Sequence, residues 1–202
     1  MIDPRAYFAA QAAAYNLPNL PAGLTVIDVL TAQDIDGSTV PYAIVIKETD
    51  GTIRLVFHGT RDWQEIVADV YAVPDGDCSA GVASRFKTLA AQSGAALSTY
   101  AGAKVGGHSL GADLAVKWIQ TYGAAEYCLF AYPCLCEQAV IDALTPVPGA
   151  ICEVLGDPIA MLVTGYSRPS NVTRFTAPRF DLDPLYYHAF ATYEAAIGAV
   201  MP

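Results

Sequence analysis

The chain has 202 residues, of which 53% are hydrophobic and 15% charged, and its formal net charge at pH 7 is −9. This length and composition predict a single domain, residues 1–202, that buries a substantial core. The acidic balance excludes a nucleic-acid partner, because phosphate recognition needs clustered basic side chains and only 11 Lys and Arg are spread along the chain.

No uninterrupted apolar run approaches the roughly 20 residues that a membrane helix needs, so we expect no stable insertion into a membrane. The first five residues, Met1 to Arg5, do not form a basic segment followed by a long apolar one, which argues against a signal peptide. We therefore expect a soluble protein that is cytoplasmic or exported by a non-classical route.

The chain contains five cysteines, Cys78, Cys128, Cys134, Cys136 and Cys152. Their number is odd, and Cys134 and Cys136 have neither a second pair nor a nearby histidine to complete a metal site. We therefore expect reduced cysteines that pack as small buried hydrophobes, and no metal. The alternative is a disulfide between distant members, and the sequence does not identify such a pair.

Apolar spacing and turn residues predict the secondary structure in chain order. The first half is expected to hold a short helix at 7–15, an edge strand at 26–30, a hairpin of strands at 42–47 and 53–57, and helices at 62–70 and 82–100. The second half is expected to hold strands at 103–106, 127–131 and 151–155, and helices at 112–119 and 138–144. This alternation predicts an α/β fold, a three-layer sandwich with a mostly parallel central sheet and functional loops at the carboxyl ends of its strands.

The pentapeptide Gly107-His108-Ser109-Leu110-Gly111 lies between a predicted strand and a predicted helix. A serine hydroxyl can attack a carbonyl when a tight strand-to-helix turn projects it clear of the backbone. Glycines two residues before and after the serine let neighbouring backbone approach without a Cβ clash. The pattern predicts that Ser109 is a nucleophile, whereas the alternative is a glycine-rich loop without a catalytic role.

A serine hydroxyl is barely ionised at neutral pH, so an imidazole must remove its proton as the new bond forms. Among the three histidines, His108 adjoins the serine and should point elsewhere, and His58 ends a strand and should support a loop. His188, in the C-terminal part of the chain, is therefore the predicted base. The alternative for His188 is a half-buried histidine in an aromatic cluster.

The carboxylate that orients the base should follow a strand located between the serine and the histidine. Asp157 meets this requirement, because it follows the predicted strand 151–155 and precedes a proline that restricts its loop. Asp181 and Asp183 are rivals, because they lie close in sequence to the histidine. Asp113 and Asp142 fall in predicted helices, where solvated or structural roles are expected.

An acyl-transfer site also needs hydrogen-bond donors for the oxyanion. The amide of Leu110, the residue after the nucleophile, is the expected first donor. Thr60 follows the strand at 53–57 and is placed to be the second, through its amide and its hydroxyl. The alternative is that Thr60 helps to cap the following helix, and both roles can coexist.

Six segments carry a family resemblance: Phe57-His58-Gly59-Thr60, Asp62-Trp63, Ala68-Asp69-Val70, Gly107-His108-Ser109-Leu110-Gly111, Gly156-Asp157-Pro158 and His188. From about Tyr42 onward, the chain resembles the class 3 lipase family of α/β hydrolases. The resemblance implies an α/β-hydrolase fold in which Ser109 is the nucleophile, Asp157 the acid, His188 the base and Thr60 an oxyanion donor.

Two features depart from the family pattern. Phe130-Ala131-Tyr132-Pro133 stands where the family has a Phe-Gly-x-Pro loop, and the residues between Thr60 and Val70 are expected to form a plain helix instead of a mobile lid. Without a lid, a small esterase that acts on soluble short- or medium-chain esters fits the sequence as well as a true lipase.

The sequence as a whole predicts hydrolysis of carboxylic esters through an acyl-serine intermediate, with a small-molecule ester or lipid as substrate and no metal or organic cofactor. Two alternatives stay open. One is a catalytically silent domain that presents an apolar cleft, and the other is an acyltransferase, thioesterase or peptidase that uses the same serine. The sequence indicates neither the oligomeric state nor the preferred acyl chain length.

Overall fold

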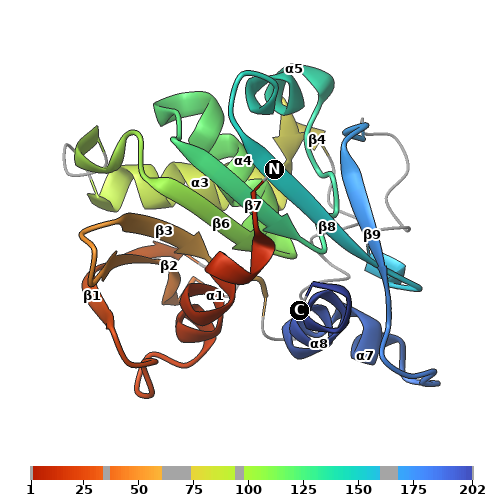
Figure 1. Ribbon diagram of the computed structural model, residues 1–202. Coiled ribbons are helices and arrows are strands. Elements are labelled where there is room, and N and C mark those ends of the chain that lie inside the picture. Colours follow the sequence, from red (N-terminus) through yellow and green to blue (C-terminus); the bar gives the residue numbers. More distant parts are fainter. Residues whose placement is uncertain (1, 34–36, 61–73, 94–97, 160–167, 202) are drawn as a thin grey trace.

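A seven-stranded sheet forms the centre of the computed structural model, which describes residues 2–33, 37–60, 74–93, 98–159 and 168–201 (Figure 1). The strand order is β1-β2-β3-β6-β7-β8-β9. The bounds are β1 Leu24–Gln33, β2 Thr39–Glu48, β3 Ile53–Phe57, β6 Lys104–His108, β7 Glu126–Phe130, β8 Gly149–Leu155 and β9 Val172–Thr176. The first three strands pair antiparallel and all later neighbours pair parallel. The carboxyl ends of β3, β6, β7 and β8 therefore meet at one edge of the sheet.

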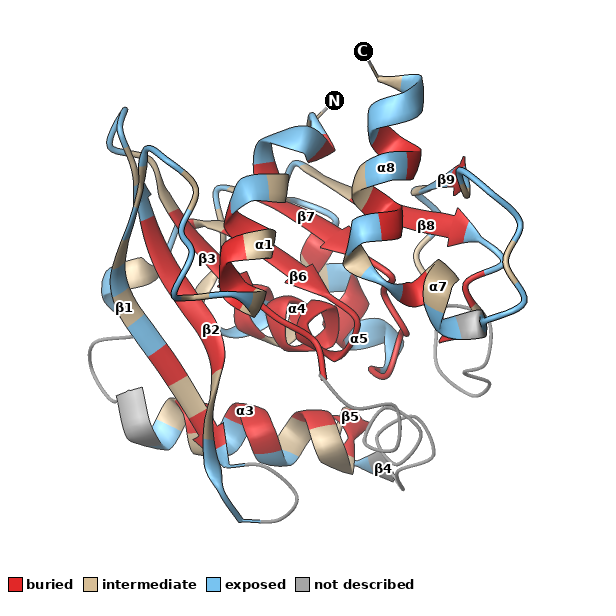
Figure 2. Cartoon of the chain, turned by 90° about the horizontal axis from the view of Figure 1, so that it is seen from below, coloured by how far each residue is buried: buried red, intermediate tan, exposed pale blue. Residues whose placement is uncertain are grey.

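Helices cover both faces of this sheet, with α1 and α8 on one side and α3, α4 and α5 on the other (Figures 1 and 2). The bounds are η1 Pro4–Tyr7, α1 Phe8–Tyr15, α3 Ala80–Ser93, α4 Leu110–Tyr122, α5 Gln138–Ile141, η3 Asp142–Leu144, α7 Pro184–His188 and α8 Phe190–Val200. The predicted three-layer α/β sandwich with a mostly parallel sheet is confirmed. Of the helices within the described ranges, none has the length and apolar character needed to cross a bilayer.

The central strands are buried on both faces, so their side chains alternate between two apolar layers. On β3, Leu55 and Phe57 belong to the core cluster that contains Trp118 of α4. Val56, between them, belongs to a separate cluster with Ala10 of α1. Burial of both faces explains why these strands are continuous apolar runs in the sequence.

Most predicted elements are present, with shifted ends. The hairpin turn at Asp50-Gly51 is confirmed, and Gly51 has the positive φ of 88° that such a turn favours. The predicted helix at 82–100 is wrong in extent: α3 is described only to Ser93, and residues 98–100 form a 3-10 turn. The predicted helix at 62–70 lies outside the described residues. Strand β9 and helices α7 and α8 were not predicted.

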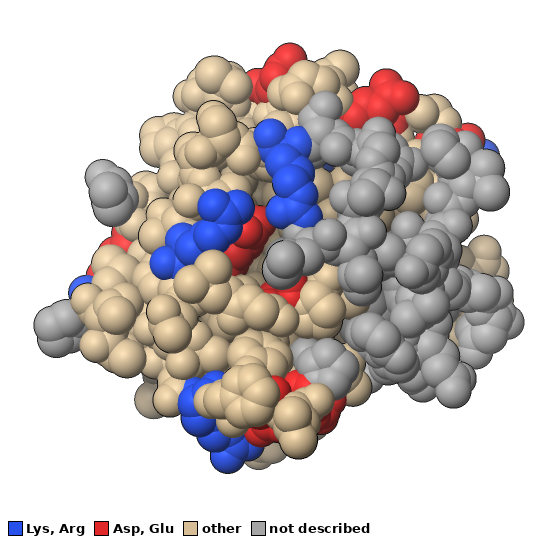
Figure 3. Space-filling model, turned by 90° about the vertical axis from the view of Figure 1, so that its right-hand side faces the viewer, with Lys and Arg blue, Asp and Glu red and all other residues tan. Residues whose placement is uncertain are grey.

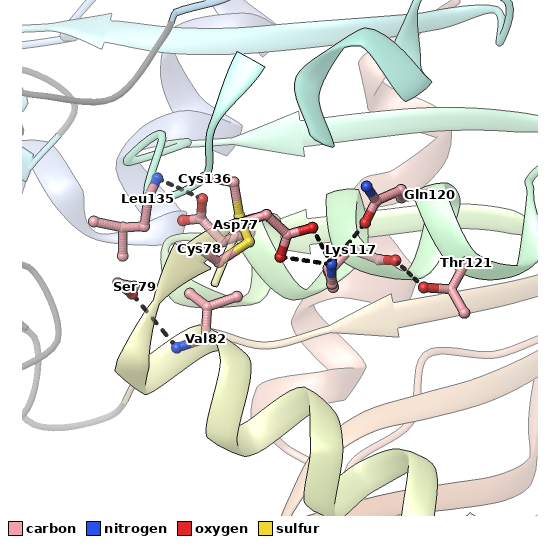
Figure 4. The surroundings of a disulfide bond; sticks show 10 residues. Asp77, Cys78, Ser79, Val82, Lys117, Gln120, Thr121, Leu135 and Cys136 are labelled. Atoms are coloured by element: carbon pink, nitrogen blue, oxygen red, sulfur yellow. Dashed lines mark hydrogen bonds and ion pairs between the residues drawn. A yellow bond between two sulfur atoms is a disulfide. The ribbon is translucent and has the colours of Figure 1, made fainter. Parts of the chain in front are cut away.

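Cys78 and Cys136 form a disulfide, so the prediction that all five cysteines are reduced is wrong for this pair. The bond joins β5 (Cys78–Ser79), which pairs with β4 (Pro74–Asp75), to the segment after β7 (Figure 4). The amide of Ser79 donates to the carbonyl of Leu135 at 2.8 Å beside it. The two cysteines are 58 residues apart, and no local pattern in the sequence couples them. The other three are free and buried, as predicted: Cys128, Cys134 and Cys152.

Removing the disulfide by the double substitution Cys78→Ala and Cys136→Ala should lower the free energy of unfolding by about 2–4 kcal/mol, because the unfolded chain regains the freedom of a long loop. Urea unfolding followed by far-UV circular dichroism measures this difference. Reducing agent should destabilise the wild-type protein and leave the double variant unchanged. Equal stabilities of oxidised wild type and double variant would contradict a structural role for the bond.

Candidate active site

Ser109 lies at a sharp turn between β6 and α4, where its backbone adopts φ 57° and ψ −133°. A Cβ added at Gly107 would come within 2.4 Å of the carbonyl oxygen of Gly111. A Cβ at Gly111 would come within 2.5 Å of the carbonyl oxygens of Phe57 and His58. The two glycines therefore allow the close packing that was predicted for a strained serine turn, and they bring the end of β3 against it.

His188 lies between Ser109 and Asp157. Its Nε2 is 2.7 Å from Ser109 Oγ, and its Nδ1 is 3.0 and 3.1 Å from the two carboxylate oxygens of Asp157. All three residues are at most 4% exposed. The fold thus brings together three side chains that come from the turn after β6, the loop after β8 and the end of α7.

Asp157 is held by donors other than the histidine. Tyr193 Oη of α8 donates to Oδ2 at 2.7 Å, and the amide of Ile159 donates to Oδ1 at 2.9 Å. Burial alone would raise the pKa of Asp157, but the hydrogen bonds from His188, Tyr193 and Ile159 outweigh it and lower the pKa below its usual value. The carboxylate is therefore kept ionised in a site almost closed to solvent.

The rival carboxylates have different partners. Asp181 pairs with Arg179 at 2.9 Å. Asp183 accepts from the amide of Leu185 at the start of α7 and acts as its N-terminal cap. Asp113 is fully buried in α4 and accepts from a backbone amide after β7, the structural role that was predicted for it.

The other two histidines take the positions expected of them. Both ring nitrogens of His58 face backbone carbonyl oxygens, that of Gly59 at 2.6 Å and that of Pro41, so the ring supports the loop after β3. The ring of His108 points away from the serine hydroxyl and interacts with other parts of the chain.

Tyr15, at the end of α1, connects three segments of the site, and no pattern in the sequence marks it for this role. Its hydroxyl accepts from the amide of Gly59 at 2.8 Å and lies 2.7 Å from Nδ1 of His108. Nε2 of His108 is 2.9 Å from the carbonyl oxygen of His188. Because a carbonyl only accepts, Nε2 must carry the proton, and Nδ1 must then accept from the Tyr15 hydroxyl.

His108 is neutral in this arrangement. Burial, followed by the proximity of His188, lowers the pKa of His108 to about 3. The neutral ring can donate from one nitrogen and accept at the other, as the two observed contacts require. The N-terminal helix, the serine turn and the histidine loop are therefore joined by one partly buried chain of hydrogen bonds.

The two predicted oxyanion donors border this region. Leu110 begins α4, where the first amides of a helix have no partner within the helix. Thr60 is 9% exposed and lines the same cavity as His108 and His188. The structure thus brings Thr60 near the predicted base. The alternative role of Thr60, as a cap of the next helix, concerns residues outside those described.

Known proteins resemble this chain in fold. No protein-family model matches the chain, and no curated protein matches it in sequence. Solved structures do match it. The Rhizomucor miehei lipase propeptide complex, in a deletion mutant, is 17% identical, with a TM-score of 0.66 over 86% of this chain and 66% of that chain. The triacylglycerol lipase of Penicillium expansum (17% identity, TM-score 0.55) and a lipase of Yarrowia lipolytica (14%, 0.62) cover 87% and 85% of this chain, and 78% and 77% of their own.

The chain has the α/β-hydrolase fold of these lipases. At such low identity the likeness establishes the fold and leaves the activity to be argued from the site. The match covers 66% of the Rhizomucor chain, so this chain spans about two thirds of the length of that protein. Within the described ranges, no group of three or more His, Cys, Asp or Glu is placed to hold a metal ion.

A cavity of about 540 Å³ opens beside the predicted base, between α1 on one side and α7 and α8 on the other. Its volume is in the range of sites that bind small molecules. Apolar side chains predominate, and the lining residues are Ala12, Tyr15, Asn16, Thr60, His108, Leu185, His188, Ala189, Phe190, Ala191 and Glu194. Both His188 and Thr60 border this cavity.

A second hollow of about 410 Å³ lies on the face that carries β9 and borders Asp157 from the other side. Figure 3 shows this face, where basic and acidic side chains lie next to one another. Glu153 accepts from Arg168 at 3.4 Å and from Arg174 at 3.2 Å. The basic groups of this hollow are therefore already paired with a carboxylate, and we assign it no ligand.

The buried, neutral His108 should make stability depend on pH. Its pKa is about 3 in the folded protein and about 6.5 in the unfolded chain, so between these values only the unfolded chain takes up the proton. Stability should be full above about pH 6.5 and fall toward pH 3, by at most about 1.4 kcal/mol per pH unit from this group.

Urea unfolding at pH 7.0 and 4.5 measures the loss. The variant His108→Gln keeps a donor for the His188 carbonyl and should lose less stability than the wild type between these two pH values. Equal losses in the wild type and the variant would contradict this account.

Proposed function

We propose that the chain hydrolyses carboxylic esters, with Ser109 as nucleophile, His188 as general base and Asp157 as the group that orients the base. The observation that supports this most strongly is the continuous pair of contacts at His188, 2.7 Å to the serine oxygen and 3.0 Å to the carboxylate. Both distances lie in the hydrogen-bonding range that this chemistry needs. The lipase fold of the chain is consistent with a small-molecule ester or a lipid as substrate.

In the proposed reaction, Ser109 Oγ attacks the ester carbonyl while Nε2 of His188 takes up the serine proton. The tetrahedral intermediate collapses when the alcohol leaves with that proton, and the acyl group remains on the serine. Water then attacks the acyl-serine and loses a proton to Nε2. This proton passes to Ser109 Oγ as the bond between the serine and the acyl group breaks, which releases the carboxylic acid and restores the free serine. No step requires a metal or an organic cofactor.

Two charges develop in these steps, a positive one on His188 and a negative one on the oxyanion, and we propose a partner for each. Asp157, kept ionised by its hydrogen bonds, stabilises the imidazolium and fixes the ring with Nδ1 as donor. The amide of Leu110 and the Thr60 loop stabilise the oxyanion.

We also propose that residues 1–202 act as one domain, because α1 and α8 from opposite ends of the chain border the same cavity.

The serine mechanism predicts that an alkyl phosphonate p-nitrophenyl ester labels Ser109 in the folded protein, detected by intact mass and peptide mapping. Ser109→Ala and His188→Ala should each abolish p-nitrophenyl ester turnover, and Asp157→Asn should lower kcat by about 10⁴-fold because it favours the wrong tautomer. Ser84→Ala, which alters an exposed serine of α3, is the matched control and should keep wild-type labelling. Absence of a Ser109 adduct in correctly folded protein would favour the catalytically silent binding domain.

The oxyanion proposal predicts a selective effect at Thr60. Thr60→Val has nearly the same shape but lacks the hydroxyl, and it should lower kcat by about 10²-fold with little change in KM if that hydroxyl donates to the transition state. Thr60→Ser keeps the hydroxyl and should retain most of the activity. Steady-state kinetics with p-nitrophenyl butyrate measures both. Equal kcat in the valine variant and the wild type would leave the oxyanion to backbone amides alone.

A further inference from the structure

Glu194 is a half-buried carboxylate on α8 whose place in the proposed reaction is unassigned. It lines the cavity that His188 and Thr60 also border. Within the described part of the chain, its carboxylate has no hydrogen-bond or ion-pair partner, and burial raises its pKa. A partly desolvated acid with no partner among the described residues is stabilised when a ligand supplies one, so such groups are candidates for binding sites.

The rest of the cavity suits a cation. The rings of Tyr15 and Phe190 both line it, nearly parallel at 26°, with centroids 6.5 Å apart. Neither lysine nor arginine is among the described lining residues, and His108 is held neutral by its lowered pKa of about 3. Aromatic faces combined with a carboxylate are the chemistry by which proteins recognise ammonium groups.

We propose that this cavity binds an ammonium group carried by the ester substrate, and that Glu194 is the residue that selects it. The proposal rests on the proposed ester hydrolysis and names the substrate class of that site. An anionic substrate would be repelled by Glu194, and a purely apolar chain would leave the carboxylate desolvated and unpaired. An ammonium group supplies the missing countercharge and contacts the aromatic walls at the same time.

The position of Glu194 on its helix limits where the cation sits. Phe190 and Glu194 are four residues apart on α8, so their side chains share one face, and their Cα atoms are about 6 Å apart along the axis. His188, the proposed base, lies just before this helix. The ammonium group should therefore be separated from the scissile carbonyl by only a few bonds, as in choline esters and short amino-acyl esters.

Matched ester pairs test this selectivity. In the first pair, acetylcholine is compared with its uncharged isostere, 3,3-dimethylbutyl acetate. In the second, the cation is in the acyl part: p-nitrophenyl 4-(trimethylammonio)butanoate is compared with p-nitrophenyl 5,5-dimethylhexanoate. The wild type should prefer the charged member of at least one pair in kcat/KM. Glu194→Gln should lower that preference by about tenfold, because it removes the countercharge and keeps the shape.

Glu137→Gln is the matched control, because it removes the same charge from an exposed residue beside α5, on the other face of the sheet. It should keep the wild-type preference. If the preference is absent in both pairs, or is unchanged in Glu194→Gln, the proposal is wrong. A general effect of net charge would lower the preference equally in both variants and would also overturn it.

A binding experiment separates this proposal from the proposed function. In Ser109→Ala protein, titration calorimetry should show that the charged member of at least one pair binds more tightly than its uncharged isostere, for example acetylcholine more tightly than 3,3-dimethylbutyl acetate. Adding Glu194→Gln to Ser109→Ala should remove this difference in affinity. If wild type hydrolyses none of the esters but this difference persists, ester hydrolysis fails and the cation site stands. If esters are hydrolysed but binding shows no difference in either pair, the cation site fails alone.

Discussion

The backbone turn at Ser109 is the constraint on which the rest of the site depends. A non-glycine residue at φ 57° and ψ −133° is strained by about 1–3 kcal/mol, and the surrounding contacts must hold it there. The amide of Ser109 donates to the carbonyl of Phe130 on β7, and the amide of Ala112 donates back to the carbonyl of Ser109. The packing of Gly111 against the end of β3 closes the turn from the other side. The position of the hydroxyl is therefore fixed by three adjacent strands.

His188, in contrast, does not lie on the sheet, and side-chain contacts hold it in place. Its ring is held by a hydrogen bond to Asp157, which also accepts a hydrogen bond from Tyr193 of α8. Its carbonyl accepts from His108, whose other nitrogen contacts Tyr15 of α1. The two helices on this face are further joined by ring contacts such as that between Phe8 and Phe190. The position of the proposed base thus depends on the packing of both α1 and α8, and a displacement of either helix would disturb the position of His188.

The sequence identified the features that are encoded locally. The residues around Ser109 combine a turn signal with a strand before it and a helix after it, and Asp157 follows an apolar strand. Strand β9 was missed because it is a partly exposed edge strand with polar residues, and α8 because its apolar residues occupy more than one face. The Cys78–Cys136 pair and the role of Tyr15 depend on contacts between segments far apart in the chain, which no local pattern reports.

The carboxylate of Glu194 has consequences for the proposed reaction itself. Ester hydrolysis through a serine develops negative charge on the oxyanion, and a second negative charge in the same partly desolvated cavity raises the energy of that state. For an uncharged ester, this repulsion opposes catalysis throughout the reaction. For an ester that carries an ammonium group, the substrate neutralises Glu194 before the oxyanion forms, so the penalty is removed as part of binding. Selectivity would then appear in kcat as well as in KM, because the cation stabilises the oxyanion transition state more than it stabilises the bound ground state.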